Sequence, residues 1–247
     1  HVLNGNYLVI DKDNVGWFNG KTITGTYHPT ERLTGDQKIE GGIVIDNVEV
    51  DLTIENVNIS YDSIIIDDAA GILLKGNAKL NLTVKGENSL KGTYGGAGIG
   101  VEENATLIIT KKSTGSLTAT GGGYGAAGIG GRATVPLNGD IKSYKTGTIE
   151  IQGGNIHAVG GDCWFKGSAT RLGGAGIGTG MYGIGGTVRI LGGTVKAEGG
   201  RDTGAGIGGG DNGAVDLIQI GGKNGEAPEV EASSWNVKYG AAIGSGR

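Results

Sequence analysis

The fold is decided by the segment Gly147–Gly161, GTIEIQGGNIHAVGG, which returns in related form as Gly186–Gly200, GTVRILGGTVKAEGG. Each copy holds two short stretches in which apolar and polar residues alternate, separated by Gly-Gly. Alternation with a period of two predicts β-strands, and the paired glycines predict the turns between them. In the first copy the expected inward residues are Ile149, Ile151, Ile156 and Ala158, and the outward ones are Glu150, Gln152, Asn155 and His157.

A second phrase, Gly-Ala-Gly-Ile-Gly, recurs between such segments. It occurs at Gly96–Gly100, Ala126–Gly130, Gly174–Gly178 and Gly204–Gly208, with degenerate copies at Ala69–Ile72 and Ala241–Gly244. Its isoleucines occupy positions 72, 99, 129, 177, 207 and 243, which gives steps of 27, 30, 48, 30 and 36 residues. A repeat in this range is typical of a solenoid, in which each unit buries its apolar face only by stacking on its neighbours.

Together the two phrases supply three short strands per repeat, and no stretch carries a useful helical period. We therefore expect an all-β chain that forms one right-handed parallel β-helix with three strands per coil. The solenoid should span residues 42–247, and residues 1–41, which lack the repeat, should form an N-terminal cap. The 48-residue step should contain two loop insertions, at 132–146 and 162–172.

Composition excludes several other classes of protein. The chain has 54 Gly but only 3 Pro among 247 residues, and Gly does not recur at every third position, so it is not collagen. The net charge of −4 makes nucleic acid a poor partner, and no apolar run approaches the ~18 residues of a membrane span. Cys163 is the only cysteine, which excludes a disulfide framework and a structural zinc site. The chain begins with His1 and stops inside a repeat phrase, so we expect it to be part of a longer, multidomain protein.

The repeat phrases resemble those of large secreted and cell-surface proteins of Gram-positive bacteria. Such proteins are similar to right-handed parallel β-helices of the pectate-lyase-like superfamily, and they are described as adhesin-like or carbohydrate-binding. The resemblance covers roughly residues 67–247 and implies an extracellular location and a polysaccharide or glycan partner. It implies no catalytic residue, because the shared positions are structural and the fold alone decides no function.

The glycines of the repeated phrase have two interpretations. With Ala97 and Ile99 facing the core, Gly96, Gly98 and Gly100 should face outward and, stacked over several coils, form a flat surface that a glycan could approach closely. Alternatively, these glycines serve tight bends and crowded neighbouring segments without any ligand.

Aromatic side chains are the candidate sugar contacts. Tyr94 and Tyr124 each precede a repeat isoleucine by five residues, so they should stack on successive coils, either as a sugar platform or as an ordinary structural pair. Trp164 and Phe165 fall in the second insertion, as binding residues or as a plug that folds the loop onto the coil. His157 is expected to point outward from a regular coil.

Acidic residues are concentrated in the first third of the chain: residues 1–90 carry 13 acids against 7 bases. Carboxylates on adjacent coils could form the pair that a glycosidase needs, could bind calcium, or could simply keep the surface soluble. None of the usual catalytic motifs, such as Gly-x-Ser-x-Gly or HExxH, is present in the sequence. Seven of these acids lie in the less regular coils expected between residues 42 and 89: Asp46, Glu49, Asp51, Glu55, Asp62, Asp67 and Asp68.

Three functions remain open from the sequence. The first is an extracellular carbohydrate-binding or adhesin module without catalytic activity, which uses Tyr94, Tyr124, Trp164, Phe165 and His157. The alternative is a glycoside hydrolase or polysaccharide lyase that uses carboxylates, and the third is a structural stalk. Calcium is the one cofactor that the residues suggest, and none is required.

Overall fold

The computed structural model describes residues 1–4, 7–29, 40–61, 68–134, 143–164, 171–222, 227–235 and 239–246. Within these ranges the protein is almost entirely β, with 23 strands and one four-residue helix, α1 (Val15–Phe18). None of the helical structure in these ranges is long and apolar enough to cross a membrane.

The larger sheet has thirteen strands in the described residues, all paired in parallel, and it curls into two arms that meet at β5 (Glu49–Ile59). β5 pairs with the first strand of each arm, β7 and β8. The first arm contains β7 (Lys79–Lys85), β10 (Thr106–Ile109), β13 (Thr148–Ile151), β18 (Thr187–Ile190) and β21 (Leu217–Ile220). The second arm contains β8 (Glu87–Lys91), β11 (Ser116–Thr120), β14 (Asn155–Val159), β19 (Thr194–Glu198) and β22 (Glu229–Ser233).

The smaller sheet has eight described strands, also parallel, and most of them are only two or three residues long. Its order follows the sequence: β2 (Leu8–Ile10), β4 (Gly41–Asp46), β6 (Ala70–Lys75), β9 (Ile99–Val101), β12 (Ile129–Gly130), β17 (Ile177–Gly178), β20 (Ile207–Gly208) and β23 (Ile243–Gly244). A separate antiparallel pair joins β15 (Asp162–Cys163) to β16 (Leu172–Gly173).

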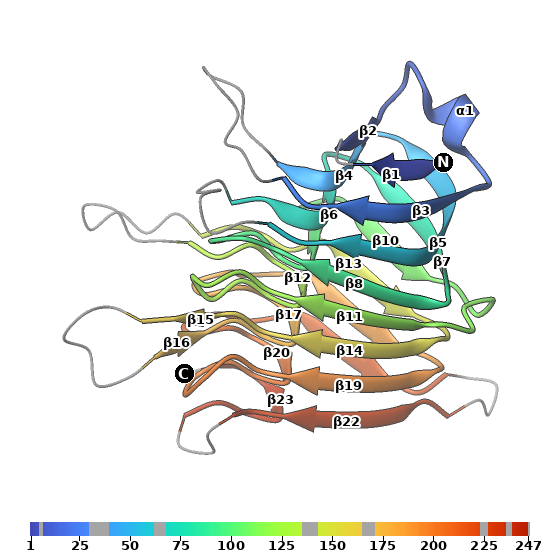
Figure 1. Ribbon diagram of the computed structural model, residues 1–247. Coiled ribbons are helices and arrows are strands. Elements are labelled where there is room, and N and C mark those ends of the chain that lie inside the picture. The colour runs from blue at the N-terminus through green and yellow to red at the C-terminus, as the bar shows by residue number, and fades with distance from the viewer. Residues whose placement is uncertain are drawn as a thin grey trace.

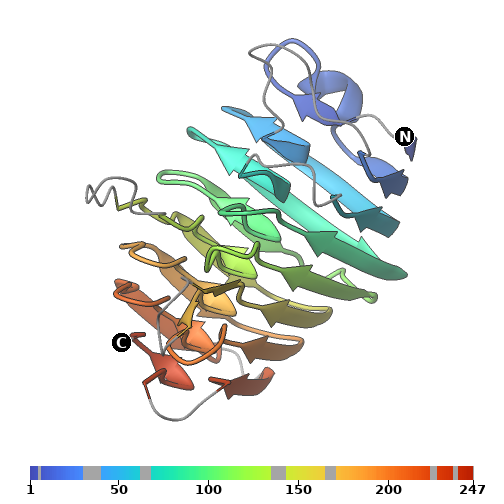
Figure 2. The ribbon, with the colours of Figure 1, turned by 60° about the vertical axis from the view of Figure 1, so that its left-hand side comes forward.

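The chain visits the first arm, the second arm and the smaller sheet in turn. β7, β8 and β9 are followed by β10, β11 and β12, and each strand pairs with its counterpart in the next turn. The second arm runs down Figure 1 from β8 to β22, and Figure 2 shows the same turns as successive steps from blue to red. The expectation of an all-β chain of stacked parallel strands is confirmed.

The repeat isoleucines form one ladder in the smaller sheet. Ile72, Ile99, Ile129, Ile177, Ile207 and Ile243 are each aligned with the next, across all five unequal steps. Insertions between repeats therefore leave the register unchanged, as expected where extra residues are accommodated in loops.

Alternation along the strands sets the core. The four predicted inward residues of β13 and β14 are fully buried, whereas His157 and Glu150 are partly exposed. The turn between the two arms requires left-handed backbone, which glycine adopts at little cost: Gly154 and Gly193, the second members of the two Gly-Gly pairs, have φ of +84° and +82°.

Most glycines of the repeated phrase are packed against backbone, which agrees with the second interpretation, crowded neighbouring segments, and not with an open flat face formed by all of them. A Cβ added to Gly98 would lie 2.6 Å from the backbone N of Thr120, and one added to Gly128 would lie 2.6 Å from that of Val159. Gly176 and Gly206 meet the equivalent atoms of Glu198 and Ser233 at 2.7 Å. The smaller sheet thus touches the end of the second arm without side chains between them.

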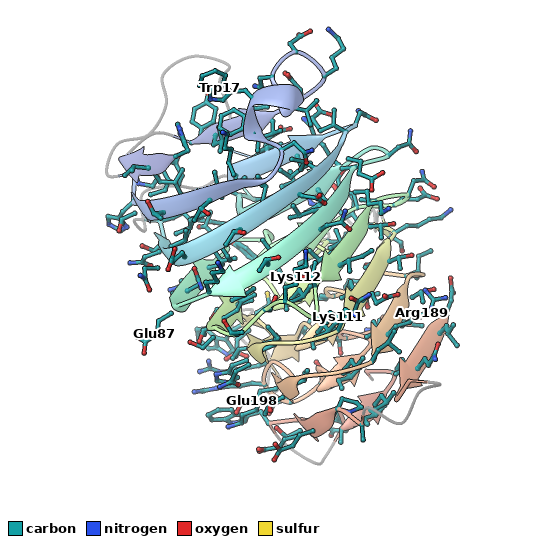
Figure 3. All side chains as sticks on the ribbon, turned by 90° about the vertical axis from the view of Figure 1, so that its right-hand side faces the viewer. Trp17, Glu87, Lys111, Lys112, Arg189 and Glu198 are labelled. Atoms are coloured by element: carbon teal, nitrogen blue, oxygen red, sulfur yellow. The ribbon has the colours of Figure 1, made fainter. Side chains whose placement is uncertain are left out.

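The N-terminal segment adds strands to both sheets. β3 (Lys21–Tyr27) pairs with β5, β1 (Val2–Asn4) pairs with β3, and β2 pairs with β4. Figure 3 shows α1, with Trp17, at this end of the stack, and Glu198 near the other. Residues 30–39 of the expected cap, and most of the expected insertions at 132–146 and 162–172, lie outside the described residues.

We predict that Gly128→Ala destabilises the protein by about 1–3 kcal/mol, because its methyl group would overpack the backbone of the second arm. The expected fall in Tm is roughly 2–12 °C, measured by circular dichroism. Gly123→Ala is the matched control, since the nearest atom to a Cβ there is 3.8 Å away. Equal stability of the two variants would contradict the packing argument.

Candidate functional site

A groove with a cavity volume of about 740 Å³ lies over the outer surface of the smaller sheet. Its floor is short of side chains, because Gly96, Gly100 and Gly130 contribute only backbone. This part of the glycine rows does line an accessible cavity, in contrast to Gly98 and Gly128. The other lining residues are Glu40, Asp68, Ala70, Leu73, Gly76, Ala97, Val101, Glu102, Glu103, Asn104, Arg132, Ser143, Tyr144 and Lys145.

Arg132 contacts two other side chains that line the groove, Asp68 and Tyr144. Its Nη2 lies 2.5 Å from Oδ2 of Asp68, and its guanidinium carbon lies 4.4 Å from the centre of the Tyr144 ring. The second oxygen of Asp68 accepts a hydrogen bond from the backbone N of Gly95 at 2.9 Å. An ion pair with a stacked arginine fixes the positions of all three side chains.

Two further ion pairs border the groove. Lys145 Nζ lies 2.8 Å from Oε1 of Glu103. Lys75 Nζ lies 2.7 Å from Glu40 and 3.6 Å from Asp46, and the hydrogen bond with Glu40 is the main reason that the pKa of Lys75 is raised.

Glu102 is the carboxyl group of the groove that is left without such a partner. Within the described part of the chain its side chain takes part in no hydrogen bond or ion pair, although the charge of Arg132 acts on it from a distance. Burial raises the pKa of Glu102 above its ordinary value, and Arg132 only partly opposes this shift.

A second cavity, of about 460 Å³, adjoins the groove and shares Glu103, Asn104 and Lys145 with it. It continues past Gly147 and Gly186 toward Asp216, across two further turns of the stack. The two cavities together could accommodate an extended ligand rather than one compact molecule.

Aromatic and basic side chains follow the turns between the second arm and the smaller sheet; we call Tyr94, Tyr124, Trp164, Arg201 and Trp235 the corner row. The rings of Tyr94 and Tyr124 stack with centroids 5.1 Å apart, as their equal offsets from the repeat isoleucines predict. Trp164 and Trp235 are 60% and 65% exposed, and Arg201 lies 5.0 Å from the centre of the Trp235 ring.

The corner row is tied to the scaffold by polar contacts and packing. Asp162, the first residue of β15, accepts a hydrogen bond from the backbone N of Arg201 at 2.6 Å, and its side chain lies 3.2 Å from Nε of Arg201. Tyr124 packs against a small buried cluster that contains Met181 and Cys163, and burial raises the pKa of the Cys163 thiol to about 11.

The remaining predicted residues are distributed over other parts of the surface. His157 lies on the outer face of the second arm, with Nε2 3.5 Å from Oε1 of Glu198, which itself pairs with Lys196 at 2.5 Å. Glu49 and Asp51 lie on β5, where they pair with Lys79 and Asn81, away from the groove. Phe165, Asp62 and Asp67 lie outside the described residues.

Of the predicted acids that fall within the described residues, Asp68 lines the groove, and Asp46 lies beside it through its contact with Lys75. Among the residues it describes, no three His, Cys, Asp or Glu side chains are close enough to hold a metal ion.

Sequence reasoning missed Glu102, Arg132 and Tyr144 as site residues. One signal was present: Arg132 and Tyr144 stand at the two ends of the expected 132–146 insertion, and Glu102 follows the repeat isoleucine Ile99 by three residues. Their convergence depends on contacts between turns, since Arg132 and Asp68 are 64 residues apart.

Comparison with protein-family models, curated proteins and solved structures finds no match to this chain. The class that the fold defines is an all-β protein of stacked parallel strands in curled sheets.

We predict that Arg132→Met raises the pKa of Glu102 further, because it removes the positive charge that holds that value down. The measurement is a carboxyl titration of glutamate-labelled protein by NMR. Lys145→Met is the control, since Lys145 is not among the cations that shift the pKa of Glu102 and should have a smaller effect. A pKa that falls or stays constant in Arg132→Met would show that Glu102 does not sense this charge.

Proposed function

We propose that this protein is a carbohydrate-binding or adhesin module without catalytic activity, and that the corner row is its glycan platform. The observation that supports this best is the sequence of rings on successive turns, with Tyr94 and Tyr124 stacked and Trp164 and Trp235 largely exposed. Ring faces match the apolar faces of pyranoses, and the NH and OH groups at their edges can bind water or hydroxyls.

Rigid support favours this surface over the isolated exposed aromatic Trp17. The corner row sits on turns whose backbone is fixed by close glycine contacts and by parallel pairing on both sides. A platform held in place loses little conformational entropy when a ligand binds.

We further infer that the chain winds as a single right-handed parallel β-helix. The chain passes through the first arm, the second arm and the smaller sheet in the same order in each turn, which supports this inference. Parallel crossover connections also have a strong general preference for the right hand. The repeat phrases additionally support kinship with secreted or cell-surface proteins of the pectate-lyase-like superfamily, and hence an extracellular location.

We predict that the double variant Trp164→Ala with Tyr124→Ala weakens glycan binding at least about tenfold, as loss of a central aromatic anchor does. Binding is measured by calorimetry for a glycan found by screening plant, microbial and mucin-type polysaccharides. Trp17→Ala is the control, because the side chain of Trp17 is 73% exposed and lies at the other end of the stack.

Because Tyr124 is half-buried, thermal unfolding checks that the double variant is folded. Trp235→Ala provides an independent test at a fully surface position. Unchanged affinity in both variants would exclude the corner row as the platform, and failure of every glycan to bind would favour a structural stalk.

Cleavage of a polysaccharide in the groove is the second candidate, favoured by the environment of Glu102. Its raised pKa suits a general acid that protonates a leaving sugar oxygen, and Asp68 on the opposite wall is a hydrogen-bond acceptor.

For this candidate we predict that incubation with the substrate polysaccharide releases reducing ends or unsaturated fragments, and that Glu102→Gln abolishes the release. Glu103→Gln, paired with Lys145 at the rim, should retain it. If wild-type protein releases no fragments from any polysaccharide that it binds, the groove is not a cleavage site.

A further inference from the structure

We propose that the groove over the smaller sheet binds a polysaccharide with free amino groups, and that Glu102 pairs with the ammonium group of an amino sugar. The proposal rests on the proposed function for the ligand class, carbohydrate, but it concerns a different surface from the corner row.

The charges around the groove favour a cationic ligand. Among the residues that the structure describes, five carboxylates, Glu40, Asp46, Asp68, Glu102 and Glu103, stand against three cations, Lys75, Arg132 and Lys145, which leaves these residues a net charge of −2. Each cation is already held by an acid at 2.5–2.8 Å. A uronic acid or sulfated chain would therefore meet a net negative surface with its cations occupied.

A ligand with an ammonium group would supply the partner that Glu102 lacks. Of the carboxyl groups that line the groove it is the one that no described cation contacts, and it is partly withdrawn from water. A half-buried carboxylate without a partner is costly, so a ligand ammonium group at hydrogen-bond distance would offset this cost.

The floor of the groove suits a flat sugar ring beside that carboxyl group. Gly100, directly before Val101 and Glu102, presents no side chain, and a Cβ there would come within 2.9 Å of Leu73 Cδ1 on the same floor. Tyr144 and Arg132 form a fixed wall, and the adjoining second cavity gives the chain room to continue.

The test compares two oligosaccharides that differ only at nitrogen: a glucosamine hexamer and its N-acetylated counterpart. Calorimetry with the wild-type protein should show tighter binding of the free amine at a pH above the raised pKa of Glu102 and below the pKa of the sugar amine, where both groups are charged. Glu102→Gln should lower that affinity about ten- to a hundred-fold, as expected for loss of a charge-assisted hydrogen bond. Glu49→Gln removes a carboxylate of β5 that is paired with Lys79, away from the groove, and should leave the affinity nearly unchanged.

Three outcomes would overturn the proposal. The first is equal binding of the two hexamers, the second is equal loss in Glu102→Gln and Glu49→Gln, and the third is equally tight binding of spermidine, which would indicate a general cation site. When one of these outcomes is found, the groove proposal fails. The proposed function still stands if neutral glycans bind the wild-type protein and lose affinity in the double variant Trp164→Ala with Tyr124→Ala.

Discussion

One backbone contact, between the smaller sheet and the end of the second arm, recurs in each turn from Gly98 to Gly206. Gly98, Gly128, Gly176 and Gly206 repeat one arrangement, in which the position of an absent Cβ lies 2.6–2.7 Å from a backbone nitrogen of the arm. Those nitrogens belong to Thr120, Val159, Glu198 and Ser233, which are themselves aligned in register. The repeat phrase keeps its glycines because the two sheets meet there at backbone distance.

This contact also determines what surrounds the candidate sites. Because the strands of the smaller sheet carry so few side chains, much of the lining of the groove comes from described residues in the segments between the strands. Arg132 and Tyr144 belong to such a segment, and Glu102 to a turn one strand earlier. On the adjacent edge the turns bring Tyr94 and Tyr124 into contact for the same geometric reason.

Much of the fold could be predicted from local pattern. Alternation placed Ile149 and Ile156 in the core and His157 outside, and the spacing of the repeat phrase anticipated the isoleucine ladder and the Tyr94–Tyr124 stack. Each of these depends only on period and offset, which a single sequence contains.

The groove could not be predicted in the same way. Periodicity indicates that Gly98 alternates with Ile99, but not how near another segment lies, and so it could not separate Gly98, which touches Thr120, from Gly100, which lines the cavity. The pairing of Arg132 with Asp68 joins residues two turns apart. Arg132 and Tyr144, at the two ends of an insertion, and Glu102, a carboxyl group without a partner, can be recognised as site residues only in the stacked structure.

The ladder of isoleucines has a consequence for how such a chain can change in length. Steps as different as 27 and 48 residues are accommodated without a change of register, because the described strands of each turn pair only with the strands directly above and below them. Duplication or loss of a whole unit beyond Ile220 would leave the lining of the groove in an unaltered environment, because the later described residues that act on it, such as Ile184 and Asp216, precede that position. The ligand specificity of the groove and the length of the scaffold can therefore evolve separately.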